Sequence, residues 1–161
     1  MTSFGLIQTF LADEAATVDV GGKIGAALIA GNVVFLEGEL GAGKTTFTRG
    51  VLRARGHTGA VKSPTYTLCE PYESDDTHLV CHLDLYRLSD PEELEFLGFR
   101  DYLASGAIVL IEWPSRGEGW LPNPDLKIEL SERGSGRALR VLALTTHGSQ
   151  VLERCGVDHV E

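Results

Sequence analysis

The sequence has few cysteines, and their arrangement does not support a cross-linked fold. Three are present, at positions 69, 81 and 155, and none belongs to a C-x-x-C pair. An odd number of cysteines without that pairing argues against a disulfide framework and against a zinc site. The histidines show no metal-ligand spacing either, and we interpret them as structural or surface residues. This cysteine usage fits a reducing cytoplasm, which is where we expect the protein to act.

Long hydrophobic runs are also missing. No apolar stretch approaches the roughly 18 residues that a membrane helix needs. No basic residue precedes Lys23, so the start of the chain does not resemble a signal peptide. We therefore expect neither a membrane span nor a secretory signal.

Basic residues are scarce relative to acidic ones. Fourteen Lys and Arg stand against 23 Asp and Glu, a formal net charge of -9, which argues against a domain that grips DNA or RNA backbones directly. The imbalance is local: residues 44–62 include five basic residues and no acidic one, whereas residues 69–101 hold ten acids and two arginines. This distribution predicts an anion site beside an acidic surface. We hypothesise that the acids of this segment other than Asp84, Asp90, Glu92 and Glu93 face a partner.

The length of 161 residues predicts a single domain, residues 1–161. With 43% hydrophobic residues the chain can form one core without metals or disulfides, but it has no room for a separate substrate domain. We find no internal repeat or linker, and residues 146–161 are a candidate C-terminal helix.

A phosphate-binding motif is the strongest signal in the sequence. Residues 38–45 read GELGAGKT, which fits G-x-x-x-x-G-K-[ST], and they lie between an apolar run (33–37) and a helical pattern (45–55). Glycines let successive N–H groups point at one phosphate, the lysine reaches the β- and γ-phosphates, and the hydroxyl after it can ligate Mg²⁺. The motif therefore predicts an α/β, three-layer P-loop NTPase fold with a mixed, mainly parallel sheet, and ATP and Mg²⁺ as cofactors. The expected nucleotide-binding residues are Leu40, Gly41, Ala42, Gly43, Lys44, Thr45 and Thr46.

The remaining pattern supplies strands and helices around this motif. After an irregular start, Asp13 can cap a helix that Gly21 and Gly22 weaken, and the sequence from Asp90 to Glu93 begins another helix with Pro91 at its first position. Expected strands lie at residues 66–72, 79–85, 107–111, 126–130 and 138–144, and a closing helix at 150–155.

Two acidic residues end apolar runs, where ligands of open α/β sheets bind. Glu112 ends the run 107–111 and Asp84 follows the run 79–83. We predict that Glu112 holds Mg²⁺ together with Thr45, and that Asp84 orients or deprotonates the attacking water, with Lys44 as the third catalytic residue. Ser63 or Thr65 supplies a hydroxyl in the loop that senses the γ-phosphate, although Ser-Pro-Thr is also an ordinary turn sequence.

Three classes of P-loop protein can be compared with the sequence. A GTPase is disfavoured because no N-K-x-D or downstream D-x-x-G is present. A small-metabolite kinase has the right size, but the segment 69–101 is acidic where such a kinase usually carries an arginine-bearing lid. A non-hydrolysing, ATP-dependent binding module also stays open.

Five blocks of residues together carry a more specific resemblance. They are GELGAGKTT (38–46), VKSPTYTL (61–68), HLDLYRL (82–88), DPEELEFLG (90–98) and IEWP (111–114). Their identity and order resemble the bacterial TsaE family, the P-loop ATPases of the machinery that installs threonylcarbamoyl on adenosine-37 of tRNAs that read codons beginning with A. The similarity extends from about residue 13 to residue 144.

The resemblance implies an ATPase that is weak alone and acts on the partner proteins TsaB and TsaD, so that tRNA is met indirectly. In this family the P-loop lysine and threonine, the aspartate of the H-x-D-L-Y-R block and the glutamate of E-W bind nucleotide and metal. These match Lys44, Thr45, Asp84 and Glu112 of this sequence. The resemblance also implies nucleotide contacts at Glu14 and Arg137, which local chemistry does not indicate.

Overall fold

The computed structural model describes residues 4–64, 66–75 and 78–159. The elements in chain order are β1 (Gly5–Leu11), α1 (Glu14–Ala27), β2 (Val33–Glu37), α2 (Lys44–Ala54), β3 (Cys69–Glu73), β4 (Leu79–Asp84), α3 (Glu93–Phe96), α4 (Phe99–Ala104), β5 (Ile108–Glu112), the 3-10 helix η1 (Pro114–Gly117), β6 (Leu126–Arg133), β7 (Gly136–Ala143) and α5 (Thr146–Arg154). In the described part of the chain, no helix is both long and apolar enough to cross a membrane.

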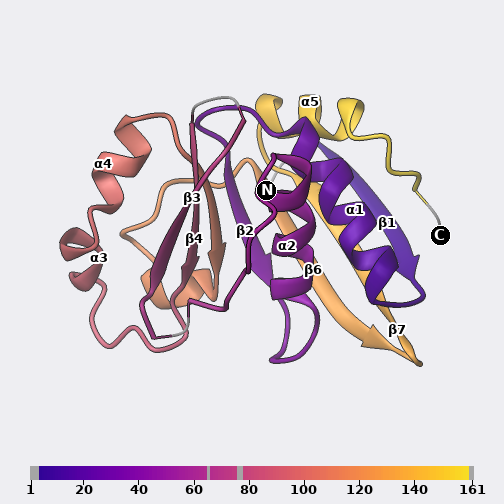
Figure 1. Cartoon of the computed structure of the whole chain (residues 1–161), viewed down its shortest axis with the longest axis horizontal. Coiled ribbons are helices and arrows are strands. Elements are labelled where there is room, and N and C mark those ends of the chain that lie inside the picture. Colours follow the sequence, from indigo (N-terminus) through magenta and orange to yellow (C-terminus); the bar gives the residue numbers. More distant parts are fainter. Residues whose placement is uncertain (1–3, 65, 76–77, 160–161) are drawn as a thin grey trace.

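The strands form one mixed sheet in the order β1-β7-β6-β2-β5-β4-β3 (Figure 1). The four central strands, β6, β2, β5 and β4, are parallel neighbours, whereas β7, β1 and β3 pair with their neighbours in antiparallel fashion. The predicted α/β fold with a mixed sheet and a parallel centre is confirmed. Since parallel strands end at the same edge, Glu37, Asp84 and Glu112 all lie at one edge of the sheet.

Helices cover the two faces of the sheet to different extents. A first core contains residues of α1, α2 and α5 together with one face of β1, β7, β6, β2, β5 and β4. A second core lies on the opposite face and joins α3, α4 and the segment after β4 to β2, β5 and β4 (Figure 1). The three predicted layers are therefore present, and the layer of α3 and α4 covers only part of its face.

The first helix confirms one local prediction, and the first strand corrects another. Asp13 caps α1, because its side chain accepts a hydrogen bond from the N–H of Ala16 at 2.9 Å. The expectation of an irregular start is wrong, since Gly5–Leu11 is a strand. It pairs with β7 residue by residue from Gly5 opposite Ala143 to Leu11 opposite Arg137. A partner that distant in sequence leaves no local signal in a seven-residue strand.

Other elements also differ from the sequence prediction in their bounds. The closing helix expected at 150–155 is α5, which begins four residues earlier, at Thr146. The strand expected at 66–72 begins only at Cys69, because the residue before it, Leu68, has a φ of 67° that interrupts an extended backbone. The helix expected to begin at Asp90 is a turn there, and α3 has four residues. Asp90 still accepts from the N–H of Glu92 at 2.9 Å, so the residue acts as a local cap of this turn.

Candidate nucleotide and metal site

The loop between β2 and α2 has the backbone that a phosphate-binding loop requires. Gly41 and Gly43 have φ values of 82° and 107°, a region that favours glycine. A Cβ on Gly38 would lie 2.5 Å from the carbonyl oxygen of Leu130, so a side chain cannot be placed at this position without a shift of β6. Lys44, Thr45 and Thr46 then form the first turn of α2, whose N–H groups lie at the positive end of the helix dipole.

Lys44 is held at the centre of this edge. Its ammonium group donates to the carbonyl of Gly38 at 2.7 Å and lies 4.2 Å from the ring centroid of Trp113, a cation–π contact. Burial lowers the pKa of Lys44, and the nearby carboxylates of Glu112, Asp84 and Glu39 oppose that shift.

The two strand-end carboxylates lie next to each other. Asp84 and Glu112 are direct neighbours in the parallel pairing of β4 and β5, and both are buried. Oε1 of Glu112 lies 3.8 Å from Nζ of Lys44. Asp84 accepts from the N–H of Tyr86 at 3.0 Å and from the Ser63 hydroxyl at 3.4 Å. The structure thus brings four of the predicted site residues together: Lys44, Ser63, Asp84 and Glu112.

His82 is a member of this cluster that the sequence interpretation missed. It lies two residues before Asp84 on β4, is fully buried, and places Nε2 2.5 Å from Oε2 of Glu112. Residues i and i+2 of a strand share a face, so the position of His82 relative to Asp84 was the available signal. Cys81 points to the opposite face and into the second core, as the alternation of a strand requires.

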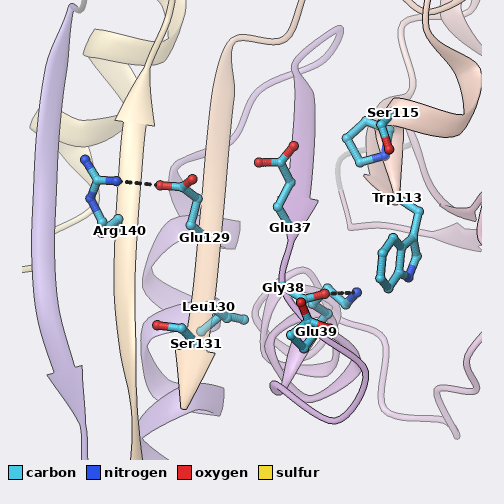
Figure 2. A pocket seen from close by; sticks show the side chains of 11 residues that line it. Glu37, Gly38, Glu39, Trp113, Ser115, Glu129, Leu130, Ser131 and Arg140 are labelled. Carbon is cyan, nitrogen blue, oxygen red and sulfur yellow. Dashed lines mark hydrogen bonds and ion pairs between the residues drawn. The ribbon is translucent and has the colours of Figure 1, made fainter. Parts of the chain in front are cut away.

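A cavity of about 510 Å³ opens beside Lys44 on the part of the sheet that α3 and α4 leave uncovered. Figure 2 shows Glu37, Glu129 and Arg140 side by side on neighbouring strands, with Trp113 and Ser115 across the cavity from them. Arg140 donates to Glu129 at 2.8 Å, and Lys127 lies 3.1 Å from Glu37. The carboxylates of this wall are therefore partly neutralised by their own neighbours.

A second, smaller cavity of about 170 Å³ contains both residues that only the resemblance indicated. Glu14 and Arg137 line it together with Gly41, Gly43 and Thr46. Arg137 donates to the carbonyls of Ala42 at 3.1 Å and Gly41 at 3.2 Å, and Glu14 forms an ion pair with Arg49 at 3.0 Å. Arg137 and Ala42, which are 95 positions apart in the sequence, are thereby in contact at the phosphate-binding loop.

The chemistry of the site fits a nucleotide and a magnesium ion. Mg²⁺ prefers oxygen ligands and is usually held by one or two protein groups together with phosphate oxygens. Thr45 and Glu112 supply a hydroxyl and a carboxylate of that kind. No group of three or more His, Cys, Asp or Glu side chains that could hold a metal ion occurs among the described residues. Leu40 projects from the loop and is 67% exposed. Thr65 lies outside the described residues.

The chain was compared with known families, proteins and structures. The family model described as threonylcarbamoyl adenosine biosynthesis protein TsaE matches residues 11–139. The chain belongs to the TsaE family. Similar proteins named tRNA threonylcarbamoyladenosine biosynthesis protein TsaE occur in Haemophilus influenzae, at 48% identity over 74% of this chain and 75% of that protein, and in Bacillus subtilis, at 38% identity over 78% and 76%. The crystal structure of Bacillus subtilis YdiB superposes with a TM-score of 0.80 at 28% identity over 94% of both chains.

The match to the TsaE family covers all the site residues predicted from the sequence. It begins at the end of β1 and ends within β7, so that it includes Glu14 at one end and Arg137 near the other. The helix α5 lies outside it. The resemblance predicted from five sequence blocks is confirmed at the level of the family.

Proposed function

We propose that this TsaE-family chain binds MgATP and hydrolyses it as the ATPase subunit of tRNA threonylcarbamoyladenosine synthesis. The observation that carries the proposal is the buried group of Lys44, Asp84 and Glu112 at the end of the phosphate-binding loop. Phosphoryl transfer needs a cation at the γ-phosphate, a carboxylate beside the metal and a group that positions water, and this group contains all three kinds. The relatives in Haemophilus influenzae and Bacillus subtilis are named tRNA threonylcarbamoyladenosine biosynthesis proteins, which supports a role in this synthesis.

Each residue has a distinct part in this proposal. Lys44 and the first-turn N–H groups of α2 bind the β- and γ-phosphates, and Arg137 and Glu14 contact the nucleotide from the smaller cavity. Thr45 and Glu112 hold Mg²⁺, which neutralises phosphate charge when it is bound. Asp84, a buried carboxylate beside Glu112, orients water, while Ser63 couples the loop 61–64 to Asp84. These interactions are positional and electrostatic, and no covalent step on the protein is needed.

We further propose that hydrolysis resets a complex of TsaB and TsaD between rounds of modification, with weak turnover by the chain alone. The net charge of -9 supports an indirect contact with tRNA, because direct binding of the tRNA phosphate backbone needs a basic surface. The proposed partner-facing surface consists of the acids of the segment 69–101 other than Asp84, in the site, and Asp90, Glu92 and Glu93, at the start of α3. A tRNA substrate also implies a cytoplasmic place of action.

The test is ATP turnover by the purified chain, alone and with TsaB, TsaD and tRNA, followed by multi-round tRNA modification. We expect partners and tRNA to stimulate turnover. Lys44→Ala should lower stimulated turnover by about 100-fold or more, since loss of one preorganised charge-stabilising donor has an effect of that order. Lys23→Ala is the matched control, because Lys23 is an exposed lysine on α1 that forms a surface ion pair with Asp19 at 3.5 Å.

The outcomes separate the proposed function from its alternatives. Undiminished multi-round modification without this chain would refute the resetting role. Turnover stimulated by a small acceptor in the absence of protein partners would identify a kinase instead. A non-hydrolysing module would show two results together. The wild type would have no ATP turnover, and ATP-dependent partner binding would persist in an Asp84→Asn variant.

A further inference from the structure

The contact between His82 and Glu112 defines the state of the histidine. A carboxylate can only accept a hydrogen bond, so the proton of the 2.5 Å contact lies on Nε2 of His82. Nδ1 of the same ring is buried and has no hydrogen-bond partner among the described residues. Among the described residues, the hydrogen bond to Oε2 of Glu112 is therefore the one polar contact of the imidazole ring.

The other carboxylate oxygen of Glu112 forms a long ion pair with Lys44. Oε1 lies 3.8 Å from Nζ of Lys44, which is longer than a hydrogen bond, and Lys44 donates to the carbonyl of Gly38 at 2.7 Å instead. Opposite charges attract strongly where water is excluded, and both side chains are at most 5% exposed. The bond from His82 to Oε2 is a contact that can limit a closer approach of Glu112 to Lys44.

We propose that His82 is a positioning residue for metal binding by Glu112. Its Nε2–H fixes Oε2, so that Oε1 stays available to Mg²⁺ and the ammonium group of Lys44 stays available to phosphate. Without the imidazole, Glu112 turns toward Lys44 and each side chain neutralises the other. The inference rests on the proposed function, because it states which charged group of that site binds Mg²⁺ and which binds phosphate.

The test compares His82→Leu, which keeps an apolar volume but loses the donor, with His82→Gln, which retains an N–H group on a flexible chain. We expect His82→Leu to raise the Mg²⁺ concentration needed for half-maximal ATP turnover by about 10- to 100-fold, the effect typical of lost partners of metal ligands. His82→Gln should recover part of that loss. His147→Leu is the matched control, since His147 is an exposed residue of α5.

A binding measurement reads the same effect without turnover. A fluorescent ADP analogue is titrated onto each variant in excess Mg²⁺ and in excess EDTA. We expect His82→Leu to weaken binding in Mg²⁺ more than in EDTA, and we expect the substitution to have no further effect on Mg²⁺ dependence in a Glu112→Gln background. The thermal unfolding of each variant is recorded alongside, and a variant that does not fold is replaced in the comparison by His82→Gln.

An unchanged Mg²⁺ dependence in His82→Leu would overturn the proposal, as would an equal loss of binding in Mg²⁺ and in EDTA, which indicates a packing role. The proposed function fails separately: a wild-type chain that never hydrolyses ATP with TsaB, TsaD and tRNA refutes hydrolysis, while the binding titration still decides the role of His82.

Discussion

The three thiols look alike in the sequence, yet their surroundings differ. Cys81 and Cys155 are buried in the two cores, whereas Cys69 is half-buried at the start of β3. Cys69 lies opposite Leu83 in the pairing of β3 with β4, so Cys69 and Cys81 are diagonal neighbours on one face. A hydrogen bond from the Cys81 thiol lowers the pKa of Cys69, while the same bond and burial raise the pKa of Cys81.

We therefore expect Cys69 to be the most reactive thiol of the folded chain. The thiolate is the reacting species, so a lowered pKa and partial exposure both favour Cys69, and its alkylation should reach its midpoint at a lower pH than that of an ordinary cysteine. Time-resolved alkylation with iodoacetamide and peptide mass analysis measure this order. Cys69→Ser should remove the fast phase and Cys155→Ser should leave it; faster labelling of Cys155 would contradict the assignment.

At the scale of elements, the contact between α1 and α2 depends on glycines that weaken each helix locally. A Cβ on Gly25 would lie 2.6 Å from Cα of Val51, and one on Gly50 would lie 2.2 Å from the carbonyl oxygen of Val18. Gly22 is different, because its nearest neighbour would be the carbonyl oxygen of Gly50 at 3.5 Å, an ordinary contact. Gly21, which weakens the prediction of α1 as Gly22 does, also allows the phosphate-binding helix to lie close, because a Cβ there would lie 2.4 Å from the carbonyl oxygen of Phe47.

Gly25→Ala should lower the free energy of unfolding by about 1–3 kcal/mol, because the added methyl group meets backbone that cannot move aside freely. Gly22→Ala is the control in the same helix. It should leave stability unchanged or raise it by up to about 1 kcal/mol, since alanine is the better helix former. Urea denaturation followed by circular dichroism measures both, and a stabilised Gly25→Ala variant would show that the two helices are not held at this distance.

The elements that could be predicted from the sequence are those whose signal is local. The phosphate-binding loop, the cap at Asp13 and the strand ends at Asp84 and Glu112 all depend on residues close in sequence. The strand β1 and the meeting of Glu14 with Arg137 depend on pairing between the two ends of the chain, which no local pattern records. His82 shares a strand face with Asp84, which is a local signal, but the contact that gives it a role is with Glu112, 30 positions away.

At the scale of the whole molecule, both cores rest on the same strands. The first core includes Val34, Leu36 and Leu110, and the second includes Val33 and Val109 from the same two strands, β2 and β5. One sheet therefore carries both cores and the candidate site at its edge. Loss of either core would expose the apolar face of the central strands, which couples the two halves energetically. This arrangement supports the proposal that residues 1–161 form a single domain.

Unfolding should accordingly occur in one cooperative transition. In a Trp120→Phe variant, Trp113 reports on the second core by fluorescence, while the far-ultraviolet circular dichroism signal comes mainly from α1, α2 and α5 on the first core. We expect the two midpoints to coincide, and MgADP at about 100 times its Kd to raise both by roughly 5–11 °C through mass action. Lys44→Ala should abolish that rise and Lys23→Ala should retain it. Separate midpoints, or a nucleotide effect on one probe alone, would mean that the faces of the sheet unfold independently, because a ligand that binds a single cooperative unit must stabilise every part of it equally.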